Sequence, residues 1–458
     1  MPENTNESRM PIHSITTRLV PYLVTLPLLG LLLGNASASD WVRFRGPNGS
    51  GISGEAIPQK WSTNIRWQVK LPGPGLSSPI VVGDRVFVTC WTGYGAEPDN
   101  NDEQTLRRHV VCLAKTDGRV LWDKTVAPYL PEDPFRGMFA ENGYASHSPV
   151  TDGERVYVFF GKTGALAFSL NGDMLWQTSV GHESGPRGWG SASSPILYED
   201  LIIVTASAES EALVALNKHN GEEVWRKEAT GFSGTWATPI LVETDQRTEL
   251  VLAVPGEVWS FAPKTGKLLW YCLGPPSNSV CASLVVDQDV VYAIGRREGG
   301  SVAIRTGGSG DVTDTHTVWT KNHRAGIGTP LLFDQRIYWI NNQVARCIDT
   351  KTGEDVFEER LSQRQRNRTN PSSGSERRRP GRRFGGRGQD YSSPVAAQDH
   401  MFFIARSGQV TVMALKDNFQ ILGNDQLGDD EEQFSATPAI ANGAIFVRSN
   451  KRLYCIAK

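Results

Sequence analysis

Side chains that could do chemistry are scattered along this sequence and match no familiar catalytic spacing. The eight histidines include no pair spaced as metal ligands. No G-x-S-x-G motif marks a nucleophile turn, and no C-x-x-C-H motif marks an attached haem. The glycine-rich run 185–190 lacks the lysine and the helix pattern of a phosphate loop. We therefore predict no catalytic residue and no metal ligand.

Other side chains are better suited to binding than to catalysis. Aromatic faces stack on planar groups, and arginine grips anions or stacks on rings. The candidate ligand-binding residues are Tyr144, Arg187, Trp189, Trp236, Asn278, Tyr391 and Phe434. They would form a concave mouth if their loops converge, or a plug of aromatic rings if they fill the same space.

Whether those loops converge depends on the fold, and a sequence repeat predicts that fold. Ser-Pro or Thr-Pro recurs before short apolar runs, with one unit in which leucine replaces proline. The anchors are Ser78, Ser148, Ser194, Thr238, Ser283, Thr329, Ser393 and Thr437. Five of the seven intervals between them are 44 to 46 residues, and the other two carry insertions. A period near 45 built from short strands is typical of a propeller with four strands per blade.

Most units also carry a glycine turn followed by a strand with a tryptophan. These docking tryptophans are Trp67, Trp122, Trp176, Trp225, Trp270 and Trp319. Phe357 takes the position in the sixth unit and Leu422 in the seventh. A repeating aromatic residue indicates packing between blades rather than a ligand site.

The eighth unit ends at Lys458 before its tryptophan strand, and residues 64–70, with Trp67, supply a matching strand. A last blade built from both termini leaves no free edge. We predict an all-β fold, an eight-bladed β-propeller of four-stranded blades whose last blade is closed by an N-terminal strand. The propeller should span 61–458 after an N-terminal extension, 39–60.

The first segment indicates export. Residues 19–34 are apolar, and Ala36-Ser37-Ala38 has the small-residue pattern of a cleavage site. We predict a signal peptide over 1–38 and a periplasmic or secreted monomer with no membrane span after cleavage. The alternative is an uncleaved anchor. The net charge of −2 gives no field that would favour specific nucleic acid binding.

One stretch departs from the nearly balanced charge of the whole chain. Residues 363–388 hold nine arginines and one acid, a charge of +8, so the rest of the chain carries −10. This composition predicts a disordered insertion. It could capture an anionic envelope polymer through arginines such as Arg377, Arg378, Arg379, Arg382 and Arg383, or it could simply keep the chain soluble.

The pattern Leu216-Asn-Lys-His-Asn-Gly-Glu-Glu-Val-Trp225 resembles the tryptophan-docking repeat of pyrroloquinoline-quinone (PQQ)-like propellers. That superfamily includes quinoprotein alcohol dehydrogenases and the outer-membrane barrel-assembly propeller. The opening run 41–51 resembles secreted PQQ-like repeat proteins of planctomycete-type bacteria. The resemblance covers about residues 40–458, and it specifies fold better than function.

The dehydrogenases of that superfamily use a disulfide between adjacent cysteines, a Ca²⁺ bound by Glu, Asn and Asp, and an Asp base. No two of the six cysteines here are adjacent. Cys112, Cys347 and Cys455 fall in a third-strand position that calls for a small residue. Cys272 and Cys281 flank one turn and are candidates for a disulfide.

We expect a binding or interaction scaffold of the cell envelope that is not an enzyme, acting on a protein or an anionic polymer. The first alternative is a quinoprotein oxidoreductase with a divergent site, and the second is an outer-membrane protein assembly factor. No cofactor is predicted, although PQQ and Ca²⁺ stay open.

Overall fold

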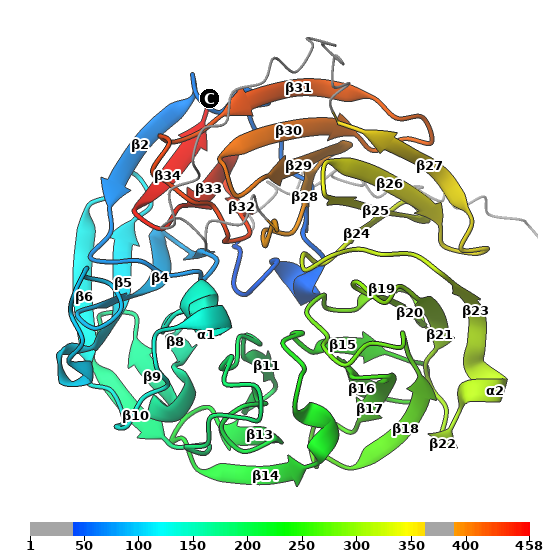
Figure 1. Cartoon of the computed structure of the whole chain (residues 1–458), viewed down its shortest axis with the longest axis horizontal. Coiled ribbons are helices and arrows are strands. Elements are labelled where there is room, and N and C mark those ends of the chain that lie inside the picture. Colours follow the sequence, from blue (N-terminus) through cyan, green and yellow to red (C-terminus); the bar gives the residue numbers. More distant parts are fainter. Residues whose placement is uncertain (1–39, 362–388) are drawn as a thin grey trace, which may run out of the picture. The chain divides into compact units, whose positions relative to one another are not determined.

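A computed structural model describes residues 40–361 and 389–458. These residues form a ring of eight antiparallel blades of four strands, confirming the predicted propeller (Figure 1). The strands are short, rich in valine and isoleucine, and joined by tight turns.

The blades follow one another along the chain, with the innermost strand first. Blades 1 to 4 are β3 (Ile80–Val82), β4 (Arg85–Thr92), β5 (Arg107–Ala114), β6 (Val120–Val126); β7 (Val150–Thr151), β8 (Arg155–Phe159), β9 (Ala165–Ser169), β10 (Met174–Thr178); β11 (Ile196–Tyr198), β12 (Leu201–Ala206), β13 (Ala212–Asn217), β14 (Glu223–Glu228); and β15 (Ile240–Glu243), β16 (Thr248–Val254), β17 (Glu257–Phe261), β18 (Leu268–Leu273). Blades 5 to 8 are β19 (Val285–Asp287), β20 (Val290–Ile294), β21 (Ser301–Arg305), β23 (Thr317–Lys321); β24 (Leu331–Phe333), β25 (Arg336–Asn341), β26 (Val344–Asp349), β27 (Asp355–Arg360); β28 (Val395–Ala397), β29 (His400–Ile404), β30 (Gln409–Ala414), β31 (Ile421–Gln426); and β32 (Ala439–Ala441), β33 (Ala444–Arg448), β34 (Arg452–Ala457), β2 (Ile65–Lys70).

Two blades gain a fifth, parallel strand. β1 (Ile52–Ser53) pairs with β28, and β22 (Gly310–Asp311) pairs with the outer strand β18. The helical pieces are short: α1 (Gly137–Asn142), α2 (Thr313–His316), and the 3-10 turns η1 (Pro47–Gly49), η2 (Glu103–Thr105), η3 (Gly161–Thr163) and η4 (Thr230–Phe232). Within the described residues, no helix has the length and apolar character needed to cross a membrane.

The ring closes through the N-terminal strand, as predicted. β2 is the outer strand of the blade formed by the C-terminus, and Trp67 lies opposite Cys455 on β34. The closure gives blade 8 a complete set of four strands, with β2 covering the outer edge of β34.

The docking tryptophans hold adjacent blades together, and the repeated glycine has a steric reason. The Nε1–H of Trp67 donates to the carbonyl oxygen of Lys115 in blade 1 at 2.9 Å. A Cβ at Gly118 would lie 2.6 Å from that indole, so a side chain there would collide with it. The same two contacts recur for Trp122 on Leu170 and Gly172, Trp176 on Lys218 and Gly221, Trp225 on Pro263 and Gly266, and Trp319 on Thr350 and Gly353.

Three seams between blades differ from this pattern. Trp270 is fully buried at the seam of blades 4 and 5, but its Nε1–H donates to Glu249 of its own blade. At the seam of blades 7 and 8, Trp61 from the N-terminal extension is fully buried and stacks on Phe402 at 6.0 Å. Blade 6 has Phe357 in the tryptophan position.

The cysteines follow the small-residue interpretation. Cys112, Cys347 and Cys455 lie opposite Trp122, Phe357 and Trp67 in the position held elsewhere by Ala215 and Ser260. All six cysteines are free thiols in the structure, so the disulfide considered for Cys272 and Cys281 is not formed.

The segment from Trp41 to Ser53 crosses the ring and ties several blades together. Trp41 bridges to Val81 in blade 1, and β1 adds to blade 7. Arg45 is fully buried and donates to five carbonyl oxygens at 2.8 to 3.1 Å, three of them on Thr329, Pro330 and Pro394. Burial lowers the pKa of Arg45 to about 9, which still leaves a cation at neutral pH. Carbonyl dipoles therefore balance its charge in place of a carboxylate.

Candidate functional site: an axial cavity

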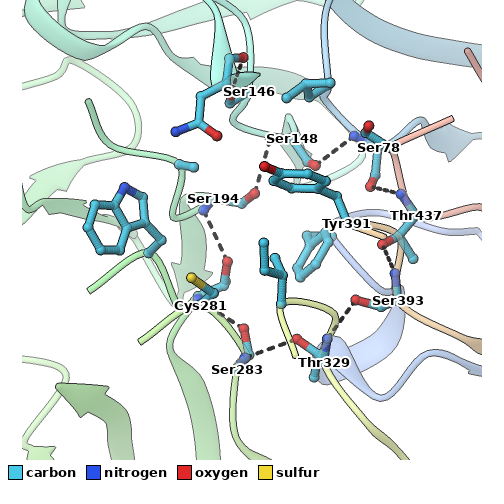
Figure 2. Close-up of a pocket in the computed structure, with 18 of the residues that line it drawn as sticks. Ser78, Ser146, Ser148, Ser194, Cys281, Ser283, Thr329, Tyr391, Ser393 and Thr437 are labelled. Carbon is cyan, nitrogen blue, oxygen red and sulfur yellow. Dashed lines mark hydrogen bonds between the residues drawn. The ribbon is translucent and has the colours of Figure 1, made fainter. Parts of the chain in front are cut away.

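The eight Ser/Thr anchors form one closed ring of hydrogen bonds. The backbone N–H of each anchor donates to the hydroxyl oxygen of the anchor in the next blade, at 2.9 to 3.1 Å. The last bond, from Thr437 to Ser78, joins the end of the chain to its beginning. Figure 2 shows this circuit around the pocket. The sequence identified the anchors by their periodic spacing. The ring explains why each anchor carries a hydroxyl, because that oxygen accepts the N–H of a neighbouring anchor.

The ring leaves eight hydroxyl protons unused. Each anchor oxygen accepts a backbone N–H, yet within the described residues none of the eight hydroxyls donates a hydrogen bond. The anchors are between 2% and 8% exposed. Buried hydroxyl groups normally use their donors, so these protons are available to an acceptor that enters the cavity.

All eight anchors line a cavity of about 140 Å³ on the ring axis. Three half-buried aromatic residues, Trp189, Trp236 and Tyr391, share the lining, and the two indoles lie 5.4 Å apart. In Figure 2, Tyr391 extends over the space inside the hydrogen-bonded circuit. Phe44 of the N-terminal segment also contributes to the wall.

One cation lines the cavity. Arg296 follows β20, and its Nη2 donates to the side-chain oxygen of Gln389 at 2.8 Å. The Nε of Arg296 is buried and has no partner among the described residues. Asn142, at the end of α1, adds an amide whose nitrogen donates to the carbonyl oxygen of Trp189. The lining thus combines donors with aromatic faces.

The structure brings together some of the sequence candidates and separates others. Trp189, Trp236 and Tyr391 line the cavity. Arg187 stacks on Trp189 at 5.2 Å and donates to the carbonyl oxygen of Asn278, and neither Arg187 nor Asn278 lines the cavity. Tyr144 is buried among Phe135, Phe139 and Trp91.

Phe434 is also fully buried and packs against Tyr454. Tyr144 and Phe434 are therefore packing residues, and neither lines the cavity. The arginines 377–383 lie outside the described residues.

A buried polar chain lies beside the ring. Ser191 donates to Glu209 at 2.5 Å, and its Oγ lies 3.0 Å from Nε2 of His147, the residue before Ser148. Burial raises the pKa of Glu209 to about 7 and lowers the pKa of His147 to about 3. Both shifts follow from desolvation, which penalises the charged form of either group. Neither group lines the cavity.

The lining does not fit a quinone paired with Ca²⁺. Ca²⁺ binds through carboxylate and carbonyl oxygens, and none of the residues that line the cavity is Asp or Glu. Over residues 40–361 and 389–458, no group of three His, Cys, Asp or Glu side chains could hold a metal ion. The cavity offers donors for a ligand and no carboxylate to act as a base.

Comparison with known proteins identifies the family to which the chain belongs. A family model, PQQ_2, described as outer membrane protein assembly factor BamB, matches residues 59–184 and 106–359, which together exceed half of the sequence. The chain belongs to the PQQ_2 family. No curated protein sequence matches it. The resemblance read from the tryptophan repeat is thereby confirmed.

Solved structures similar to this PQQ_2 propeller come from proteins with different functions. BamB from Moraxella catarrhalis is 12% identical, with a TM-score of 0.55, covering 85% of this chain and 96% of its own. Quinohemoprotein alcohol dehydrogenase from Comamonas testosteroni is 10% identical, with a TM-score of 0.60, covering 92% and 81%. At such low identity the likeness shows the fold alone.

Sequence reasoning missed Arg296 and the purpose of the anchors. Arg296 stands outside the loops that precede the anchors, so its approach to the axis follows from the turn after β20. The ring carried a signal, because a hydroxyl residue occupies all eight anchor positions. That regularity could have predicted a shared hydrogen-bonding role.

Proposed function

We propose that this PQQ_2 propeller is an exported binding protein of the cell envelope that holds a small planar carboxylate in its axial cavity. The ligand is bound and presented without being chemically changed. The observation that carries the proposal is the ring of eight buried hydroxyls whose protons have no acceptor among the described residues.

The chemistry of the lining supports this ligand class. Hydroxyl donors and the free Nε of Arg296 would meet acceptor oxygens, and hydrogen bonds to charged acceptors are the stronger kind. Trp189, Trp236 and Tyr391 offer faces for a flat ring. A ligand with oxygens and a planar body would use both features at once.

Calorimetry with terephthalate, a planar aromatic dicarboxylate, tests the proposal. Terephthalamide has the same shape without charge and serves as the ligand control. We expect one molecule of terephthalate to bind per chain, and terephthalamide to bind at least about tenfold more weakly, since losing one charged pairing costs more than about 1.4 kcal/mol.

Two variants locate the binding. Arg296→Met should weaken terephthalate binding at least about tenfold, while Arg297→Met, an exposed neighbour outside the lining, should leave it unchanged. Equal affinity for the two ligands, or equal loss in both variants, would refute an axial carboxylate site.

The alternative function is a quinoprotein oxidoreductase, favoured by the fold shared with quinohemoprotein alcohol dehydrogenase. The mature protein supplied with PQQ, Ca²⁺ and an artificial electron acceptor should oxidise neither alcohols nor aldose sugars. Turnover above a blank of metal and quinone, lost in Trp236→Ala, would replace the binding proposal with the enzyme.

The family description supports a second candidate, assembly of outer membrane proteins. This role needs a surface that engages a protein, whereas the axial cavity suits a small molecule. A variant that loses terephthalate binding separates the two roles. Arg296→Met should leave outer-membrane protein levels unchanged in a deletion strain, and a fall in those levels would favour assembly.

A further inference from the structure

Arg43 is a buried cation that uses few of its hydrogen-bond donors. It is 7% exposed, and its Nη2 donates to the carbonyl oxygen of Pro239 at 3.1 Å. No other hydrogen bond or ion pair joins its guanidinium to a described residue, and its Nε is buried without a partner. Arg45, two residues along the same segment, is also buried, yet it donates five hydrogen bonds to carbonyl oxygens. A guanidinium has five N–H donors, so Arg45 is satisfied within the chain, whereas Arg43 uses one donor of five.

The charge of Arg43 also lacks a counter-ion among the described residues. Desolvation by burial lowers the pKa of Arg43 to about 10, and no carboxylate raises it again. The side chain is therefore a cation at neutral pH. A buried charge is unfavourable unless it is paired and hydrogen-bonded. The unused donors are available to an anion that enters beside Arg43.

Arg43 lines an open groove of about 1150 Å³. The groove shares no lining residue with the axial cavity. The N-terminal segment contributes Val42, Arg43 and Asn48 to the groove and Phe44 to the cavity. Figure 1 shows this segment, in blue, near the centre of the ring. A ligand in the groove would thus be separate from a ligand in the axial cavity.

The turns that border the groove are acidic. Glu243, Asp245 and Asp289 line it, and among its described lining residues no lysine and no second arginine accompanies Arg43. The carboxylates of Asp245 and Asp289 form no hydrogen bond or ion pair with a described residue. Pro239, whose carbonyl oxygen holds Arg43, lies four residues before Glu243 at the end of β15. A strand rises about 3.3 Å per residue, so about 13 Å of extended backbone separates the cation from the acidic border.

Apolar side chains lie along the groove between these two ends. Leu197, Leu241 and Val286 each stand three residues after an anchor, on the first strands of blades 3, 4 and 5. All three are half-buried and line the groove. Leu241 lies between Pro239 and Glu243 on one strand. The groove therefore suits a long molecule with a carboxylate at one end, an apolar or neutral middle and cations at the other end.

We propose that this groove binds the C-terminal end of a partner polypeptide, with its terminal carboxylate on Arg43 and basic side chains three or four residues earlier on Asp245 and Asp289. Guanidinium and carboxylate form strong, charge-assisted hydrogen bonds. An extended chain spans about 3.4 Å per residue, so about four residues bridge the two ends, and a single amino acid is too short. Capture of a terminal carboxylate is a recurring mode of peptide recognition. The site does not depend on the axial carboxylate site.

The experiment uses the full chain and a synthetic peptide, acetylated at its N-terminus, with two lysines followed by serine, glycine and a C-terminal alanine. Calorimetry should show one peptide bound per chain. The same peptide with a C-terminal amide should bind at least about tenfold more weakly, because it has no carboxylate for Arg43. A peptide with glutamine in place of both lysines should bind at least about threefold more weakly, since exposed ion pairs contribute less.

Variants of the chain locate the two ends of the peptide. Arg43→Met keeps an apolar side chain of similar length and should weaken binding at least about tenfold, while binding of the amide peptide stays unchanged. The double variant Asp245→Asn and Asp289→Asn should remove the preference for lysine over glutamine. Asp334→Asn alters an exposed acid in the corresponding turn of blade 6, outside the groove, and should leave binding intact. Arg296→Met, which alters the axial cavity, should also leave peptide binding intact.

Several results would overturn the proposal. Equal affinity for the carboxylate and amide peptides would exclude capture of the terminus, whether or not Arg43→Met folds. An unchanged preference for lysine in the double variant would exclude the acidic turns as the second contact. Binding lost in Arg296→Met and retained in Arg43→Met would assign the peptide to the axial cavity. Free lysine that binds as tightly as the peptide would replace the polypeptide end with a small zwitterion.

Discussion

Ser191 links two buried groups whose pKa values have moved in opposite directions. It contacts Glu209 at 2.5 Å and His147 at 3.0 Å. The pKa of Glu209 rises from 4.5 to about 7, so this group stabilises the fold below pH 4.5 and loses that effect as pH rises towards 7. The pKa of His147 falls from 6.5 to about 3, so its stabilisation is complete above pH 6.5 and is lost on acidification.

These opposed effects should cancel between pH 4.5 and 6.5, and single variants should expose them. We expect Glu209→Gln to lose stability relative to wild type on acidification over that range, by about 1 kcal/mol per pH unit. His147→Gln should gain relative stability over the same range. Urea unfolding at several pH values measures both. Parallel pH profiles for wild type and the two variants would show that the groups do not titrate as described.

At the scale of elements, a docking indole of one blade packs against a glycine in the turn of the next blade. Gly221 has a φ of +77°, and an added Cβ would lie 2.7 Å from the indole of Trp176. Gly256 has nearly the same φ, +78°, with nothing within 4 Å of the added atom. Backbone strain is therefore matched at the two positions, and the steric clash differs.

We expect Gly256→Ala to cost about 1–2 kcal/mol through the left-handed backbone alone. Gly221→Ala should cost a further 1–3 kcal/mol, roughly, because the indole must move. Chemical denaturation of the two variants gives the difference. Equal losses would mean that the seam tolerates a displaced indole and that glycine serves the turn only.

The closing strand β2 allows a second prediction at this scale. A chain that begins at Pro72 lacks β2 and Trp67, whereas one that begins at Trp61 retains both. The shorter chain should be less stable by more than about 4 kcal/mol, since the buried Trp61 and Trp67 are lost together with the strand that covers the edge of β34. Thermal melting compares the two, and identical melting temperatures would contradict closure by this strand.

At the scale of the whole molecule, periodicity predicted the eight blades, the closure and the small position filled by cysteine. The repeating pattern recurs in successive units, so each unit adds evidence for the same prediction. The lining of the axial cavity was harder to predict, because loops approach the axis by different routes. Trp189, Trp236 and Tyr391 reach the cavity, whereas Tyr144 and Phe434 pack into the core from similar positions before their anchors. Arg296 carries no repeat signal.

The net charge of the chain is divided unevenly between one basic segment and an acidic remainder. Residues 363–388 carry +8 and the remainder −10. Replacing 363–388 with a short Gly-Ser linker should abolish salt-sensitive binding to heparin, because the remaining acidic body repels polyanions. The melting temperature should change little. Heparin binding that persists with the same salt dependence would place the polyanion site on the propeller itself.

Anomalous diffraction can locate a carboxylate ligand in the axial cavity. Crystals of residues 39–458 soaked in bromoterephthalate, a planar dicarboxylate with one heavy atom, would report where such a ligand binds. We expect one bromine peak inside the ring of eight anchors, beside Arg296 and Trp236, and its loss in Arg296→Met. An axial cavity without bromine, or a peak elsewhere that survives the substitution, would contradict it.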